Sequence, residues 1–133
     1  MRRLLVAVAL ASPLGLLTGC AGFDHIEFSV SSSPVNVTVT NNEIRIPEGV
    51  AVVVKARPMT TDDVMSSDTE VKLLAGNPVF LGVSFAFPDS GSSESSEAQW
   101  SFVLSGVHVG TTTLSVQVDD EVEREIPAVI VAQ

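Results

Sequence analysis

The sequence predicts an all-β fold consisting of a single antiparallel β-sandwich. Apolar and polar residues alternate with period two along most of the chain after residue 25, which gives each predicted strand one face for a core. Turn-forming residues interrupt the alternation at intervals of about eight to twelve residues, as is typical of sandwiches. No helical period is sustained after Cys20. We therefore expect about nine short strands packed in two layers.

Four strands are expected before the first long polar stretch. Asn41-Asn42 and Pro47-Glu48-Gly49 are turn sequences that separate them. The run 50–56 begins apolar on both faces, which favours a central strand, and Lys55 and Arg57 mark its exposed end. The apolar positions of the three earlier strands are Ile26, Phe28 and Val30, then Val35, Val37 and Val39, then Ile44 and Ile46.

Five further strands are expected after residue 70. The segment 58–70 is polar without a clean period, and 88–98 is an acidic, serine-rich stretch that predicts a loop. Asp119-Asp120 is a predicted tight turn, and Pro127 indicates that the last strand lies at a sheet edge or contains a bulge. These strands contain Val71 to Ala75, Val79 to Phe87, Trp100 to Leu104, Thr112 to Val118, and Val122 to Val131.

The first nineteen residues have the pattern of a secretory signal. Arg2 and Arg3 give a positively charged start, and residues 4–17 are apolar apart from Ser12, Pro13 and Gly15. This run is too short and too interrupted for a membrane-spanning helix. We therefore predict that residues 1–19 are a helical signal peptide.

The end of this signal, Leu17-Thr18-Gly19-Cys20, resembles the lipobox of bacterial lipoproteins. In that family a diacylglycerol is attached to the cysteine sulfur and the chain is then cut before it. The resemblance implies that Cys20 is a lipidation site and that residues 20–25 form a lipidated tether. Two or three acyl chains hold a protein stably at a membrane, whereas one binds reversibly. Ala21, in place of the aspartate that favours inner-membrane retention, indicates the outer membrane or cell surface.

Composition limits what the mature chain can do. Residues 20–133 are long enough for one domain with a core but too short for two ordinary domains. The net charge is −9, and loss of Arg2 and Arg3 with the signal makes it more negative. This charge argues against nucleic acid and against electrostatic binding to anionic lipid. Cys20 is the single cysteine, so the fold depends on its core and not on a disulfide.

Several segments resemble group 2 bacterial immunoglobulin-like domains. They are the alternation that leads into Pro47-Glu48-Gly49, the segment Ser66-Ser67-Asp68 before Val71-Lys72-Leu73, the closing run Gly110-Thr111-Thr112-Thr113-Leu114-Ser115-Val116, and the valine-rich strand Ile126 to Val131. The resemblance covers about residues 35–131. It implies an immunoglobulin-like sandwich over residues 26–133 that serves adhesion, display or spacing without catalytic chemistry.

A chagasin-like cysteine peptidase inhibitor is a first alternative, because that family shares the sandwich. Pro58-Met59-Thr60-Thr61-Asp62 falls after the strand that precedes the family's Asn-Pro-Thr-Thr-Gly loop, but it lacks the asparagine and the glycine. The family's Arg-Pro-Trp loop has no counterpart here. Trp100, the single tryptophan, lies on an alternating apolar face where core packing is expected.

A calcium-stabilised surface module is a second alternative. Asp62-Asp63, Asp119-Asp120-Glu121 and Glu123 with Glu125 bring carboxylates to expected loop ends, which calcium prefers. None of these groups has the one-three-five spacing of a dedicated calcium loop, so a solvated acidic rim is favoured.

Few residues of the sequence occur in patterns typical of catalytic sites. His25 and His108 lie in different segments and have no metal-ligating partners at a recognisable spacing. We expect no catalytic residue, no metal site and no cofactor. The sequence therefore predicts a non-enzymatic, lipid-anchored module of the bacterial cell envelope. Its expected partners are the membrane, through lipid on Cys20, and an unidentified protein or glycan, with no nucleic acid.

Overall fold

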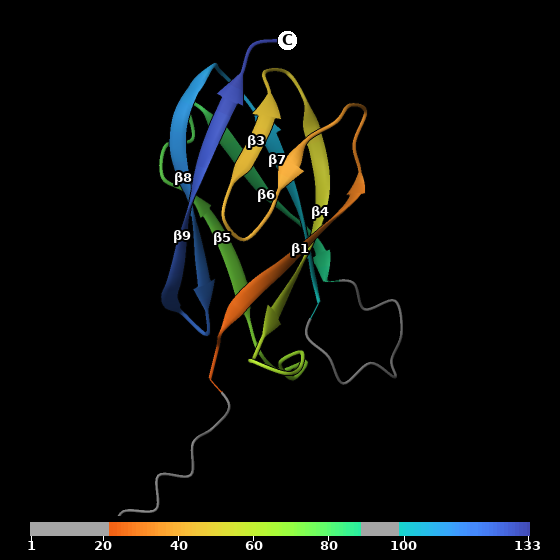
Figure 1. Ribbon diagram of the computed structural model, residues 1–133, viewed down its shortest axis with the longest axis vertical. Helices are drawn as coiled ribbons and strands as arrows, with labels where there is room; N and C mark the ends of the chain where they lie inside the picture. The colour runs from red at the N-terminus through yellow and green to blue at the C-terminus, as the bar shows by residue number, and fades with distance from the viewer. Residues whose placement is uncertain (1–21, 89–98) are drawn as a thin grey trace, which may run out of the picture.

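The structure, a computed structural model, describes residues 22–88 and 99–133, which form two β-sheets packed face to face (Figure 1). Cys20, the predicted signal peptide and most of the predicted loop 88–98 lie outside the described residues. The strands that the structure describes are β1 (His25–Ser32), β2 (Thr38–Val39), β3 (Ile44–Pro47), β4 (Ala51–Met59), β5 (Val71–Ala75), β6 (Leu81–Pro88), β7 (Trp100–Gly106), β8 (Gly110–Val118) and β9 (Glu121–Val131).

The two sheets differ in size and pairing. Sheet A has the order β1-β4-β7-β6, and its neighbouring strands are all antiparallel. Sheet B has the order β2-β3-β9-β8-β5, and within it β3 pairs with β9 in parallel while the other pairs are antiparallel. The strands β5 and β6 are therefore the edges on one side of the sandwich, and β1 and β2 are the edges on the other.

The N-terminal part of the chain belongs to both sheets. The strand β1 pairs with β4 in sheet A, whereas β3 pairs with the C-terminal strand β9 in sheet B, so the segment 33–37 crosses between the layers. Two packed sheets joined in this way form a sandwich of the immunoglobulin-like kind. The predicted fold class is confirmed, and β4 is a central strand as expected. The parallel pairing of β3 with β9 was not expected.

Alternate residues of both sheets fill a continuous core. In β4 the side chains of Val52, Val54 and Ala56 are buried, and their neighbours in sequence are half-buried or exposed. Complete burial of a Val, Leu or Ile side chain contributes about 1.5–3 kcal/mol to stability. The largest fully buried side chains include Ile26, Ile44, Ile46, Leu81, Leu104, Leu114, Ile126 and Ile130.

Two strands are shorter than the alternation predicts. The side-chain oxygen of Asn77 accepts a hydrogen bond of 3.0 Å from the backbone N–H of Val79, and the Asn77 carbonyl accepts one of 3.2 Å from Phe80. These turn bonds replace strand pairing, so β6 begins at Leu81 and Val79 is exposed. The strand expected around Val35 is reduced to Thr38–Val39, because the preceding residues cross between the sheets.

The two expectations for the last hairpin had different outcomes. Asp119 and Asp120 have φ angles of 49° and 67°, which are the left-handed values that a two-residue type I′ turn needs. The tight turn is therefore confirmed. The expectation for Pro127 is met in part: β9 lies between β3 and β8 and is not an edge strand, but its pairing with β8 does contain a register shift, which falls near Val122 and not at Pro127. Proline is tolerated there because β3 pairs with β9 only from Ala128 onward.

The two ends of the sandwich carry different loops (Figure 1). At the end where the described chain begins, which we call the proximal end, the N–H of Asp24 donates to the Met59 carbonyl at 2.8 Å, and the loop 60–70 and the turn 119–120 lie nearby. At the opposite, distal end, the N–H of Gly49 donates to the Gly106 carbonyl at 2.8 Å. The C-terminus also lies at the distal end.

Candidate interaction surface

The two histidines lie at opposite ends of the sandwich. The Nδ1 of His25 is 2.8 Å from a carboxylate oxygen of Asp24, and that of His108 is 3.3 Å from a carboxylate oxygen of Glu48. Both histidines are therefore surface residues beside one carboxylate each. Within residues 22–88 and 99–133, no three His, Cys, Asp or Glu side chains gather as a metal site would require.

The acidic groups considered for calcium make local structural bonds. The Oδ1 of Asp63 accepts a hydrogen bond of 2.9 Å from the N–H of Val64, and the Oδ1 of Asp119 accepts one of 2.9 Å from the N–H of Glu70. Because Glu70 precedes β5, the second bond fastens the β8–β9 turn to the start of that edge strand. These carboxylates act as caps for backbone N–H groups.

One ion pair strengthens the same corner. The Nζ of Lys72 donates to Oδ1 of Asp120 at 2.5 Å and lies 3.5 Å from a carboxylate oxygen of Glu70. The hydrogen bond with Asp120, aided by the charges of both carboxylates, raises the pKa of the Lys72 ammonium above its ordinary value of 10.5. One cation thus faces two carboxylates, and this end of β5 has an excess of negative charge.

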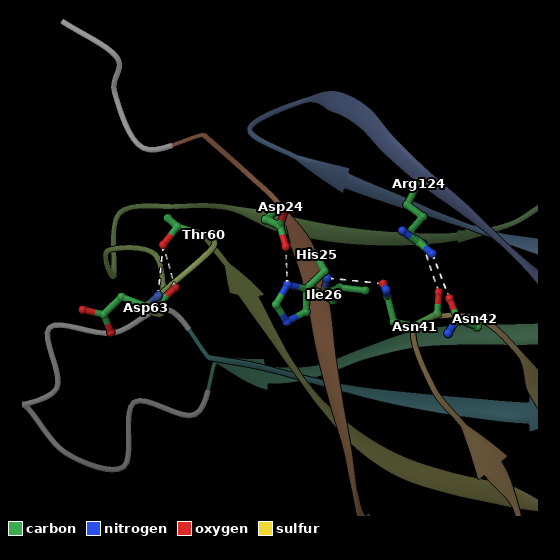
Figure 2. A network of polar contacts seen from close by, with 8 residues as sticks. All are labelled: Asp24, His25, Ile26, Asn41, Asn42, Thr60, Asp63 and Arg124. Atoms are coloured by element: carbon green, nitrogen blue, oxygen red, sulfur yellow. Dashed lines mark hydrogen bonds and ion pairs between the residues drawn. The ribbon is translucent and has the colours of Figure 1, made fainter.

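A polar network closes the opposite side of the sandwich, where β1 and β2 are the edges (Figure 2). The Nε of Arg124 donates to the backbone carbonyl of Asn41 at 3.0 Å, and its terminal nitrogen donates to the side-chain oxygen of Asn42 at 2.9 Å. The side-chain oxygen of Asn41 lies 3.4 Å from the N–H of Ile26 in β1. These contacts tie β1, the β2–β3 turn and β9 together across the two sheets.

The loop 60–70 is also held by hydrogen bonds at its start. The hydroxyl of Thr60 donates to the Asp63 carbonyl at 3.1 Å, and it accepts from the N–H of Asp63 at 3.1 Å (Figure 2). This polar segment, which has no strand period, therefore forms a compact turn at the proximal end.

On the β5/β6 side the two sheets leave an open apolar groove of about 340 Å³. Its floor comes from Val71 and Leu73 of β5, Val83 and Phe85 of β6, and Trp100 and Phe102 of β7, with Glu70, Lys72 and Leu74 at its rim. The ring centroid of Phe85 is 5.8 Å from that of Trp100 and 5.7 Å from that of Phe102. A concave, largely apolar surface of this kind is typical of a binding site.

Trp100 is held in a fixed position in this groove. Its indole N–H donates to the backbone carbonyl of Thr69 at 3.0 Å, which joins β7 to the segment before β5. Core packing was expected for Trp100, and it does pack against the core, but it is only partly buried and one part lines the groove. The groove was not predicted, although the run from Val79 to Phe87 supplied its apolar residues.

A second group of apolar side chains is exposed at the distal end. Val79, Val107 and Val109 lie on adjacent loops, and the N–H of Val107 donates to the Phe80 carbonyl at 2.8 Å. The ring of Phe80 packs directly over Gly110, where a β-carbon would meet it at 2.5 Å. The distal loops are therefore held close together by backbone bonds and by this ring.

Comparisons with known proteins identify the fold but no family. No family model and no curated protein matches the sequence. The fold is similar to domains 4 and 5 of the S-layer protein SbsC, with a TM-score of 0.52 at 15% identity over 80% of this chain and 54% of that one. It is also similar to a structure of SbsC domains 4–9, with a TM-score of 0.52 at 16% identity over 84% of this chain and 15% of that one. The chain thus spans about half the length of the two-domain structure.

The fold is therefore a two-layer β-sandwich similar to that of the SbsC domains. The groove on the β5/β6 side and the charged corner at Lys72 are suited to contacts that depend on shape and charge. In the part of the chain that the structure describes, no helix is long and apolar enough to cross a membrane.

Proposed function

We propose that this protein is a bacterial lipoprotein whose immunoglobulin-like sandwich is a non-enzymatic binding or structural module at the cell envelope. The observation that carries the anchor is the apolar run that ends in Leu17-Thr18-Gly19-Cys20. The likeness of the sandwich to S-layer protein domains supports a structural or contact role at the surface. Resemblance to group 2 bacterial immunoglobulin-like domains supports the same role.

The tether between the anchor and the sandwich is short. Phe23 already packs against the core, and Asp24 is hydrogen-bonded to Met59. Residues 20–22 alone then separate the lipid from the folded domain. Since an extended residue spans at most about 3.3–3.6 Å, the proximal end is held within about 10 Å of the acylated cysteine.

The proximal end carries negative charge close to the anchor. Asp62, Asp63 and Asp120 are exposed, and the loop 60–70 and the turn 119–120 that carry them lie at the end where the described chain begins (Figure 1). Carboxylates are repelled by anionic lipid head groups over about one Debye length, roughly 10 Å. The domain is therefore not drawn electrostatically onto an anionic membrane surface, which leaves its distal end and β5/β6 side accessible to partners.

Fatty-acid labelling in a bacterial host tests the anchor. Wild-type chain is expected to incorporate a clickable fatty acid and to fractionate with membranes, and Cys20→Ala is expected to lose both. A matched control moves the thiol to an exposed strand position: Cys20→Ala combined with Ser32→Cys keeps one cysteine and is expected to stay unlabelled. Unchanged labelling and fractionation of Cys20→Ala would disprove the proposal for Cys20.

A further inference from the structure

The groove on the β5/β6 side exposes the interior of the sandwich. Phe85 points to the inner face of sheet A, as do Leu81 and Val83 at the same alternation, yet its side chain is 54% exposed. It is exposed because, among the residues that the structure describes, β5 and β6 are the last strands of their sheets on this side, so the groove between them opens to solvent. The uncovered space is the position that one more strand of sheet B would occupy.

The backbone of β5 has hydrogen-bonding groups on its outer edge that suit pairing with such a strand. Its pairing with β8 uses the even-numbered residues: the Glu70 carbonyl accepts from Asp119 N–H at 2.9 Å, and Gly76 N–H donates to Thr113 at 2.8 Å. Along a strand, the backbone groups of successive residues point to opposite sides. Val71, Leu73 and Ala75 therefore point their N–H and C=O groups away from β8. Among the described strands, β5 pairs with β8 alone, which leaves these groups at a free edge.

We infer that the β5 edge and its groove bind an extended polypeptide strand of a basic partner by strand addition to sheet B. Inward side chains of the added strand would fill the groove over Phe85 and Trp100, and its backbone would bond to Val71, Leu73 and Ala75. This mode gives affinity through main-chain hydrogen bonds and specificity through alternate side chains. The inference rests on the binding role proposed above but not on lipid attachment at Cys20.

The charge of the partner follows from the rim. Glu70 and Asp120 share the cation Lys72, and Asp119, which accepts a hydrogen bond from the N–H of Glu70, lies beside them, so the rim at the start of β5 is negative. The whole chain carries −9 as well. A strand with alternating apolar and Lys or Arg residues therefore complements both the groove and its rim.

The same observations disfavour two other occupants. A second copy of this chain would bring another negative rim and another charge of −9 to the contact. A glycan needs polar groups facing it, but the groove floor is apolar and the indole N–H of Trp100 is already bonded to Thr69. A polypeptide strand fits the site better than either.

Two blocked synthetic peptides provide the probe: Thr-Val-Lys-Val-Lys-Val-Thr, and the same peptide with both lysines replaced by glutamate. The full chain is used in detergent micelles. Because Trp100 is the single tryptophan, its emission reports the groove directly. The lysine peptide is expected to shift this emission to the blue and to slow amide exchange at Val71, Leu73 and Ala75. The glutamate peptide should bind at least about tenfold more weakly, and added salt should reduce the difference.

Three variants test the mode of binding. Ala75→Pro removes one outward N–H while the even-numbered bonds to β8 remain, so the domain stays folded and peptide affinity falls about tenfold or more. Phe85→Ser is expected to weaken binding by removing apolar contact in the groove. Glu70→Lys should weaken binding of the lysine peptide and strengthen binding of the glutamate peptide. Glu43 is a similarly exposed carboxylate that pairs with Arg45 on β3, so Glu43→Lys should change the binding of neither peptide.

Specific outcomes would overturn the inference. Unchanged Trp100 emission and unchanged amide exchange at β5 with millimolar lysine peptide would do so. So would full binding by Ala75→Pro, or equal binding of the two peptides. A dimer in sedimentation that Ala75→Pro dissociates would make a second copy the occupant instead. The Cys20→Ala labelling experiment has no bearing on these results, so the two proposals fail separately.

Discussion

The guanidinium of Arg124 in β9 is bonded to the backbone of Asn41, 83 residues earlier in the chain, at 3.0 Å (Figure 2). The contact is partly buried, and Asn41 in turn reaches the N–H of Ile26 in β1. One side chain therefore helps to hold the crossover between the sheets, where strand pairing is sparse because β2 has only two residues.

Replacing Arg124 with Ala should lower the free energy of unfolding by about 1–3 kcal/mol, because a charge-assisted hydrogen bond to a partly buried carbonyl is lost. Urea denaturation of both proteins measures the difference. Arg45→Ala is the matched control: its guanidinium is exposed and bonds only to Glu43 among the contacts described, so a change within about 0.5 kcal/mol is expected. Equal effects of the two substitutions would contradict the proposed role of Arg124.

Leu104 and Leu74 allow the loss of a buried leucine side chain to be compared with the loss of an exposed one. Leu104 in β7 is fully buried, and Leu74 in β5 is 49% exposed. Leu104→Ala should destabilise the fold by about 2–5 kcal/mol, since it removes buried apolar surface and leaves a cavity. Leu74→Ala should cost less than about 0.5 kcal/mol. Thermal unfolding checks both, and a small loss for Leu104→Ala would contradict the assigned core.

Gly106 permits a close approach between the sheets at the distal end. Its N–H donates to the Val50 carbonyl at 2.9 Å, and a β-carbon at this position would overlap the carbonyl of Pro47. Gly106→Ala is therefore expected to lower stability by about 1–3 kcal/mol through forced backbone movement. Ser105→Ala, one position earlier on β7, serves as the control in the same denaturation experiment and should differ little from wild type. If Gly106→Ala were as stable as wild type, the close approach of Gly106 to Pro47 would not constrain the fold, and the prediction would be wrong.

The ion pair of Lys72 predicts a pH dependence at alkaline pH. Its pKa is raised in the folded state by the hydrogen bond with Asp120, so its contribution is complete below the ordinary value of 10.5 and is lost as the pH rises through the raised value. Lys72→Met should therefore be less stable than wild type at neutral pH and match it at higher pH. Lys72→Arg should keep the contribution over the whole range, because arginine stays charged. Denaturation curves at several pH values test this, and a stability gap between wild type and Lys72→Met that is independent of pH would refute it.

The alternation of apolar and polar residues predicted most of the strands, because a strand with one buried face has an apolar residue at every second position. The side chains of Ile44 and Ile46 are buried, as their alternation with Glu43 and Arg45 predicts, and the turn at Asp119-Asp120 follows from local chemistry. Pairing partners were harder to predict. Period two is the same in parallel and antiparallel strands, so nothing in the residues of β3 indicated that it pairs with β9 in parallel.

The candidate surface was missed for a related reason. Phe85 and Trp100 have the same pattern as core residues, but Phe85 is exposed and Trp100 is only partly buried, because the described part of sheet B ends at β5 on this side. Exposure of an inward-facing residue depends on how many strands the opposite sheet has at that point. That number is a property of the whole topology and not of any local stretch. The lipidation prediction for Cys20 lies outside the described residues and stays a prediction.

The crossover from β1 to β3 also determines how the domain responds to tension. Because the described chain begins at one end of the sandwich and finishes at the other, a pull between the two ends runs along β1 and β9 and not across them. Hydrogen bonds between strands are roughly perpendicular to that direction. They are loaded side by side, so many must break together, and the sandwich resists stretching far better than it would if its strands could be peeled away one bond at a time.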